Sequence, residues 1–250
     1  MTGRGSGKIF HPSPNPTVKI GLTVSLSPPN LPIFPLTSHP SEPFHIVITA
    51  RILSTPHPSL PITLCTHRNP FEGFSGSPTF KDIYRVYPAP TDLTTPMYER
   101  KKISLFFGWP HYVTPLSDDL KDFMDFVTIP SLDSGQSVSV QHEVRRSNIE
   151  KAEVSAGEVY EVHMTEKCMG TTWWQYGALE EGVRIGYHKG DIDREGWARD
   201  EEEERACREA RERRERGERV ARGEEPEGLE LVDEGGAVRF EVVELDARQS

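Results

Sequence analysis

The sequence predicts a mostly β protein, a β-sandwich followed late in the chain by one long charged α-helix. Apolar and polar residues alternate in many short segments, which is the pattern of strands with one buried face. Of the 21 prolines only Pro226 lies beyond Pro130, so the first half of the chain cannot hold long helices. Residues 191–222 differ from the rest because they carry many charges of both signs and few apolar residues.

The strands are clearest at residues 18–26 and 44–52, where every second side chain is apolar. Further strands are predicted at residues 61–67, 82–87, 103–107, 126–129, 137–144, 159–165 and 183–187. Short helices are predicted at residues 117–125 and 147–151, each beginning at a serine that can cap it. Many short strands separated by turns are typical of immunoglobulin-like sandwiches, including arrestin-like ones.

Residues 191–222 predict a long helix that is exposed to solvent. Glutamates repeatedly precede arginines by four residues, as in Glu201 and Arg205, an order that stabilises a helix by about 0.2–0.5 kcal/mol per pair. The stretch lacks the two apolar positions per heptad that a coiled coil needs, so we do not expect it to dimerise. A solvated spacer is favoured over a binding surface.

The domain organisation follows from these patterns. We expect a flexible N-terminal segment at residues 1–16, one sandwich domain at 17–190, the charged helix at 191–222 and a return segment at 223–250. The return segment alternates at residues 237–243 and can hold a last strand. The helix is therefore expected to be an insertion or extension between strands.

Composition and charge exclude several classes of function. The net charge of −10 argues against nonspecific binding to nucleic acid or to an anionic membrane. No apolar run reaches the length of a membrane span, and the N-terminus lacks the apolar core of a secretory signal. Three widely spaced cysteines predict a reducing, intracellular location, cytoplasmic or nuclear. No metal or cofactor motif is present, and we expect a monomer.

Two groups of aromatic residues are the best candidates for a binding surface. They are Trp109, His111 and Tyr112 in GWPHY, and Trp173, Trp174 and Tyr176 in TTWWQYG. Adjacent residues of a strand face opposite sides, so one of the two neighbouring indoles should lie outside the core. An exposed indole can anchor a partner. Alternatively, the nearby ALEEGV segment or the base of the charged helix at Trp197 covers it.

A noncatalytic protein-interaction module is the predicted function, with a sheet edge or the Trp-rich surface as the binding element. The alternative is an enzyme or small-ligand binder with a pocket near Trp109, His111, Cys168 and Trp174. In that interpretation Cys168 is a thiol nucleophile, with His111 or His163 as its base. His142 is more readily explained as a hydrogen-bonded residue than as a metal ligand. A third class is a scaffolding spacer, which depends on the charged helix.

Four segments, PITLCTHRNPFE, GWPHY, DFVTIPSL and GTTWWQYGALEEGVRI, resemble segments of uncharacterised β-sandwich proteins of filamentous fungi. The resemblance covers residues 17 to about 187. It implies a shared domain and assigns no activity, catalytic residue or cofactor.

Overall fold

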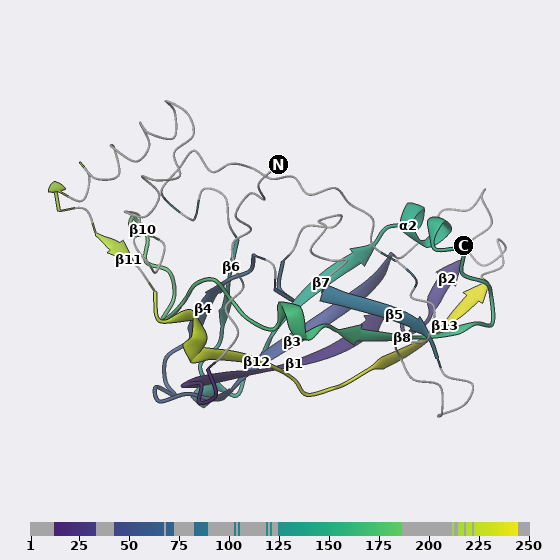
Figure 1. The fold of residues 1–250 in the computed structure, drawn as a ribbon, viewed down its shortest axis with the longest axis horizontal. Coiled ribbons are helices and arrows are strands. Elements are labelled where there is room, and N and C mark those ends of the chain that lie inside the picture. Colours follow the sequence, from purple (N-terminus) through teal and green to yellow (C-terminus); the bar gives the residue numbers. More distant parts are fainter. Residues whose placement is uncertain are drawn as a thin grey trace.

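A computed structural model describes residues 13–33, 43–67, 69–72, 83–89, 125–186, 215–217, 219–221 and 223–244, together with residues 103, 105, 119, 121 and 212. These residues form a mostly β structure with several sheets and few helices. Figure 1 shows an elongated body in which the longest strands run along the length of the molecule. The mostly β fold class is thereby confirmed.

The first four-stranded sheet has the order β12-β1-β3-β7. Its strands are β1 (Val18–Ser27), β3 (Phe44–Ser54), β7 (Val138–Val144) and β12 (Leu229–Asp233). β1 pairs antiparallel with β3 and parallel with β12, and β3 pairs antiparallel with β7. The alternation of apolar residues predicted β1 and β3 correctly. The apolar side chains Ile20, Leu22, Ile46 and Ile48 on the inner faces of these strands are fully buried.

The second four-stranded sheet has the order β2-β13-β8-β5. Its strands are β2 (Leu31–Ile33), β5 (Tyr84–Pro88), β8 (Val159–Met164) and β13 (Val238–Glu244). β13 lies inside this sheet, antiparallel to β8 and parallel to β2. The chain after the charged stretch therefore contributes β12 to one sheet and β13 to the other. The sequence patterns did not predict β2 or β12.

The inner faces of these two sheets share one apolar core. Phe44 on β3 contacts Phe240 on β13 with ring centroids 5.6 Å apart, and Phe240 stacks on Tyr160 of β8 at the same distance. All three side chains are buried. At about 25 cal/mol per Å² of buried apolar surface, each such aromatic side chain contributes more than a smaller aliphatic one.

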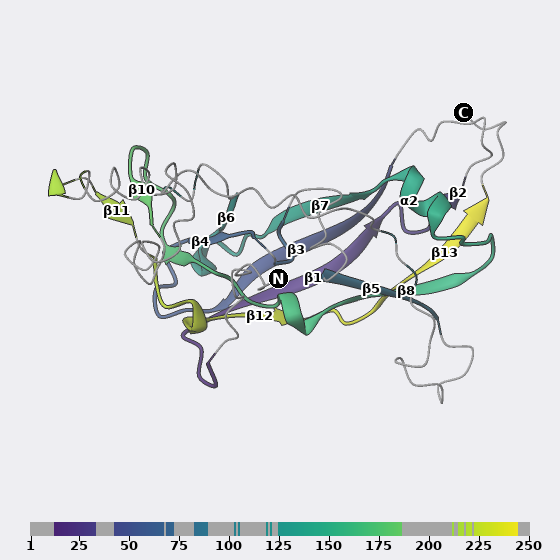
Figure 2. The same cartoon turned by 45° about the horizontal axis from the view of Figure 1, so that its top comes forward.

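Two smaller sheets form one end of the molecule, far from β13 (Figure 2). β4 (Ile62–Cys65) pairs antiparallel with β6 (Phe126–Ile129) and with β9 (Trp174–Tyr176). β10 (Arg184–Ile185) pairs parallel with β11 (Val220–Ala221). The predicted strand at residues 183–187 is thus shorter, with only two paired residues.

Helical structure is confined to short elements among the described residues. The α-helix α2 (Arg146–Lys151) confirms the helix expected at 147–151. The 3-10 helices are η3 (Leu132–Ser134), η4 (Glu166–Cys168) and η6 (Pro226–Gly228). Most of the helix predicted at 117–125 and of the strand predicted at 103–107 lies outside the described residues, as do residues 1–12 of the N-terminal segment.

Most of the predicted charged helix also lies outside the described residues. Near its end, the Arg216 N–H donates to the Glu212 carbonyl at 3.0 Å, the spacing of an α-helical turn. Gly217 then has φ +83°, a conformation that ends a helix. Val220 and Ala221 form β11, so the prediction of helix to about residue 222 is wrong for these two residues. Pairing with β10 and the partial burial of these two apolar side chains outweigh the helical preference of their neighbours.

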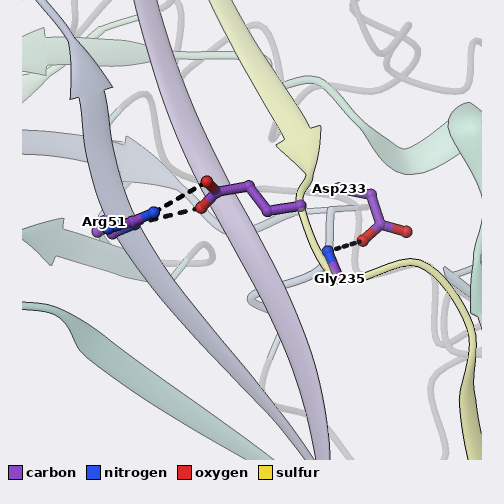
Figure 3. A network of polar contacts seen from close by, with 4 residues as sticks. Arg51, Asp233 and Gly235 are labelled. Atoms are coloured by element: carbon purple, nitrogen blue, oxygen red, sulfur yellow. Dashed lines mark hydrogen bonds and ion pairs between the residues drawn. The ribbon is translucent and has the colours of Figure 1, made fainter.

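A polar clip fastens the turn after β12 to the outer face of the first sheet (Figure 3). Arg51 on β3 donates to both carboxylate oxygens of Glu234, from Nε at 3.2 Å and from Nη2 at 3.0 Å. The Glu234 carboxylate lies over Gly21 of the intervening β1, where a Cβ would be 2.6 Å from Glu234 Cδ. Asp233 Oδ1 accepts from the N–H groups of Gly235 and Gly236 at 3.1 and 3.0 Å, which shapes the turn. Glycine on β1 therefore makes room for the clip.

Candidate functional site

Two adjacent tryptophans organise the end of the molecule formed by β9, β10 and β11. Trp174 belongs to the main core, whereas Trp173 packs in a separate cluster with Cys65 and Ile185. Both indoles are buried, with 0% of Trp173 and 2% of Trp174 exposed. The two side chains thus serve different apolar clusters, as expected for neighbours on an extended chain.

Hydrogen bonds hold the backbone on either side of Trp173. The Cys65 N–H donates to the Trp173 carbonyl at 2.9 Å. The Thr171 hydroxyl lies 3.1 Å from the Cys65 carbonyl, which also accepts from Asn69 Nδ2 at 2.7 Å. These buried polar groups are satisfied by one another, so β4, β9 and the loop at residues 66–72 form a rigid support for the indole.

The return segment crosses the indole edges at Gly223. This glycine has φ +72°, and a Cβ there would lie 2.7 Å from Trp173 Nε1 and 2.6 Å from the Trp174 carbonyl oxygen. The next residue, Glu224, donates its N–H to the same carbonyl at 2.7 Å, and Trp174 Nε1 donates to the Glu225 carbonyl at 2.9 Å. Only glycine combines the positive φ with such close approach. Gly223 thereby determines where β11 and η6 lie relative to the tryptophans.

A cavity of about 320 Å³ lies beside this cluster. Its described lining has five apolar residues that are buried or half-buried, the half-buried Gln175 and two exposed charged residues: Leu179, Val183, Ile185, Val220 and Ala221, then Gln175, then Glu180 and Arg219. Leu179, Ile185 and Ala221 also pack in the Trp173 cluster, so the cavity wall rests on the buried indole. The volume is at the lower end of that found for small-molecule sites and suits one or two apolar side chains.

The charged pair at the cavity is held less firmly than the backbone of Val183 and Ile185. Arg219 pairs with Glu180 at 3.0 Å, but the two side chains are 74% and 61% exposed, so the pair contributes little stability and can rearrange. Hydrogen bonds to Asp119 and Lys121 fix the backbone of Val183 and Ile185. Asp119 Oδ1 accepts from the Ile185 N–H at 3.1 Å, and the Lys121 ammonium donates to the Val183 carbonyl.

The lining offers both apolar contacts and polar groups. Its eight described residues include a carboxylate, Glu180, and a guanidinium, Arg219, and none of the eight is a serine, cysteine, histidine or tyrosine. Within the described ranges no group of three or more histidine, cysteine, aspartate or glutamate residues is placed to hold a metal ion. The arrangement can bury an apolar group and orient a polar one through Gln175, Glu180 or Arg219.

The residues predicted as a binding surface have different environments. Trp109, His111 and Tyr112 lie outside the described residues, as does Trp197. Trp173 and Trp174 are buried, and Tyr176 is half-buried with its ring 4.7 Å from that of His57 in an edge-on arrangement. The contact of Leu179 with the Trp173 cluster agrees with the alternative that ALEEGV covers the indole. Because both indoles are buried, neither Trp173 nor Trp174 is exposed for a partner, and a surface at Trp109, His111, Tyr112 and Tyr176 stays a prediction.

The structure does not bring Cys168 and His163 together. Cys168 is buried in the main core, where the Thr165 hydroxyl donates to its sulfur at 3.7 Å. His163 lies on the outward face of β8, with Nε2 3.4 Å from the Glu161 carboxylate. His142 belongs to the core and its Nδ1 is 2.6 Å from the Tyr84 hydroxyl, in accord with a hydrogen-bonded structural role. The other proposed base, His111, lies outside the described residues.

Sequence reasoning missed the cavity because three of its residues belong to the charged stretch. Arg219, Val220 and Ala221 were assigned to a solvated helix. The signal that could have found them is the apolar pair Val220–Ala221, which interrupts a run of charges shortly before Gly223. An apolar pair next to a glycine at the end of such a run indicates that the chain has returned to the folded body.

Comparison with known proteins leaves geometry as the basis for a function. No family model, curated protein or solved structure matches this chain. Among the described residues, no helix has both the length and the apolar character needed to cross a bilayer.

Proposed function

We propose that this chain is a noncatalytic, intracellular protein-interaction module built on an immunoglobulin-like or arrestin-like β-sandwich. In this proposal the cavity beside Trp173 accepts an apolar side chain from an extended segment of a partner protein. Support for the sandwich comes from two four-stranded sheets whose inner faces share one core. Support for binding comes mainly from one observation, a cavity of about 320 Å³ lined by five apolar residues, Gln175 and the exposed Glu180 and Arg219.

In this proposal the apolar lining residues supply the affinity, and the polar ones orient the partner segment. Val183, Ile185 and Val220 offer the partner a dry contact, and burial of a leucine-sized side chain contributes about 1.5–3 kcal/mol. Gln175 and the exposed Arg219–Glu180 pair offer hydrogen bonds to the partner's backbone. Cavities of this composition, supported by a rigid aromatic residue, are typical of the centres of interfaces.

The charged stretch of residues 191–222 ends beside this cavity. Its residues Val220 and Ala221 form β11, which pairs with β10 ahead of the stretch, and the Gly186 N–H donates to the Ala221 carbonyl at 2.9 Å. A partner that contacts Val183 and Val220 therefore contacts the chain both before and at the end of the stretch. In the proposed module the stretch acts as a solvated spacer.

The test uses peptides selected against the purified chain. Peptides from a random library displayed on phage are selected on the wild type, and their affinity is measured for two variants. Val220→Glu places a carboxylate in the lining of the cavity. Val159→Glu makes the same change at an exposed strand residue that does not line the cavity. We expect at least tenfold weaker binding to Val220→Glu and an unchanged affinity for Val159→Glu. Equal binding to both variants would refute the cavity as the binding site.

Small-ligand binding at the same cavity is the second candidate. Its volume would accommodate a compact apolar molecule with one or two polar groups. A thermal-shift screen of such molecules distinguishes the two functions, because a ligand that binds only the folded state raises the melting temperature as its concentration rises. A shift that disappears in Val220→Glu, without any peptide selected by the cavity, would favour the small-ligand function.

A further inference from the structure

Two loops that are hydrogen-bonded to each other each carry an exposed leucine, one directly after β3 and one at η3. Only three large hydrophobic residues in the described part of the chain are more than a third exposed: Leu60 at 41%, Leu132 at 37% and Val159 at 41%. Leu60 lies in the loop between β3 and β4, and Leu132 begins η3. Val159 is on β8, in the other large sheet. Two of the three therefore belong to neighbouring loops.

The two loops are joined and shaped by backbone hydrogen bonds. The Asp133 N–H donates to the Pro58 carbonyl at 3.0 Å, which links η3 to the loop at residues 55–61. Within that loop the Leu60 N–H donates to the His57 carbonyl at 3.1 Å, closing a turn. Pro56, Pro58 and Pro61 restrict the backbone further. Leu60 and Leu132 are thus presented on a preformed surface, which lowers the entropic cost of binding.

The exposed surface continues onto β9 through an aromatic contact. The exposed His57 ring meets the Tyr176 ring edge-on at 4.7 Å, and Pro56 and Pro58 beside it are exposed as well. We call the surface formed by Pro56, His57, Pro58, Leu60 and Leu132 the loop patch. It carries rigid apolar groups from two loops, with a half-buried tyrosine at its margin.

Two acidic residues lie near the loop patch. Asp133 is exposed directly beside Leu132, and the carboxylate of the exposed Glu224 is near enough to Tyr176 to help raise the pKa of its hydroxyl, for which burial is the larger cause. Lys19, whose strand position pairs with Ser54 next to the loop, is bound to Glu230 at 2.9 Å and partly neutralised. The whole chain carries a net charge of −10. A segment that combines apolar anchors with positive charge complements such a surface, whereas a second copy of this acidic chain is repelled.

We propose that the loop patch docks a basic, apolar-anchored peptide segment of a partner protein, at a site separate from the cavity beside Trp173. Leu60 and Leu132 contact the apolar anchor, while Asp133 and Glu224 attract flanking lysine or arginine residues. The site is independent of the proposed function, because no loop-patch residue lines the cavity.

The experiment is a selection of heptapeptides displayed on phage, with the wild-type chain as bait and the Leu60→Glu/Leu132→Glu variant for counter-selection. We expect enriched peptides to carry lysine or arginine beside leucine, phenylalanine or tryptophan. Their affinity, measured by fluorescence anisotropy, is expected to fall at least tenfold in the double variant and to weaken as salt concentration rises. Val159→Glu and Val220→Glu are expected to change it less than twofold, which separates this site from the cavity.

A charge-reversal variant, Asp133→Lys/Glu224→Lys, keeps both leucines and provides a second readout that does not depend on new charges in the apolar part. It is expected to weaken the basic peptides at least fivefold. The proposal is overturned by a selection that enriches nothing, by enriched peptides without basic residues, or by affinity that falls in Val220→Glu instead. Sedimentation showing a wild-type dimer that the leucine variant dissociates would assign the loop patch to a second copy of the chain and overturn it too.

Discussion

Acidification is predicted to destabilise this protein through one buried histidine. His142 on β7 is 1% exposed, and the hydroxyl of the equally buried Tyr84 lies 2.6 Å from its Nδ1. In the neutral tautomer that carries its proton on Nε2, Nδ1 accepts the proton of that hydroxyl. Burial lowers the pKa of His142 from 6.5 to about 4, because the charged imidazolium loses its hydration in the core.

The magnitude follows from proton linkage. Between pH 6.5 and about 4 the unfolded chain binds a proton at His142 that the folded chain does not bind. The contribution of the uncharged, buried His142 ring to the free energy of unfolding is therefore complete above pH 6.5 and is lost as the pH falls towards 4. At about 1.4 kcal/mol per pH unit, the loss is roughly 2 kcal/mol at pH 5 and about 3 kcal/mol at pH 4.

The assay compares urea unfolding of the wild type with that of His142→Gln from pH 7.5 to pH 4. The glutamine amide can accept the Tyr84 hydroxyl proton and does not titrate, so contributions from carboxylates cancel between the two proteins. We expect the difference in unfolding free energy, wild type minus variant, to fall by about 3 kcal/mol over this range. A difference that is constant with pH, or a His142 ring that titrates near 6.5 by NMR, would show that the reasoning is wrong.

Three further predictions concern the clip, the return segment and the thiols. Gly21→Ala displaces the Glu234 carboxylate, so the coupling of Arg51 to Glu234 in a double-mutant cycle should vanish in that background; persistent coupling would contradict the clip. Gly223→Ala should destabilise the fold by at least 2 kcal/mol more than Gly236→Ala in urea unfolding. Both glycines have positive φ, but only Gly223 meets backbone within 3 Å, so equal costs would disprove the close approach. Burial raises the pKa of the Cys65 thiol to about 11, so maleimide labelling at pH 8, followed by mass spectrometry, should be at least 100-fold slower than in denaturant.

Much of the central fold could be predicted from alternation alone. β1, β3, β7 and β8 each have a clear two-residue period, and the predicted ranges overlap the observed ones. The last strand, β13, lies at 238–244 where the alternation at 237–243 placed it. Each of these strands has one face against a common core, so every second side chain is buried and apolar, which gives the sequence its two-residue period.

The elements that could not be predicted are those defined by distant partners. β12 is a five-residue segment that becomes a strand by pairing in parallel with β1, more than 200 positions earlier. β11 is two residues long and depends on β10 and on the Trp173 cluster. The sequence of either segment does not specify the strand with which it pairs, because parallel pairing of short strands is determined by tertiary contacts.

The candidate site shows the same limit. TTWWQYG was identified from its aromatic residues, and the opposite facing of Trp173 and Trp174 follows from the geometry of an extended chain. The cavity needed Val220 and Ala221, which are distant in sequence and surrounded by charges. The exposed leucines of the loop patch could not be recognised at all, since a lone leucine in a proline-rich loop gives no sign of its exposure.

Hydrogen exchange on a complex with a peptide selected by the cavity tests the central claim most directly. β10 and β11 are held together by few backbone bonds, among them Arg184 N–H to Arg219 O at 3.3 Å, so they open readily in the unbound chain. Peptide binding is predicted to slow exchange at residues 175–186 and 219–223 and to leave β7 and the loop at residues 55–61 unchanged. Slowed exchange at β7 or at that loop, with none at β10 and β11, would contradict the cavity as the site of partner binding.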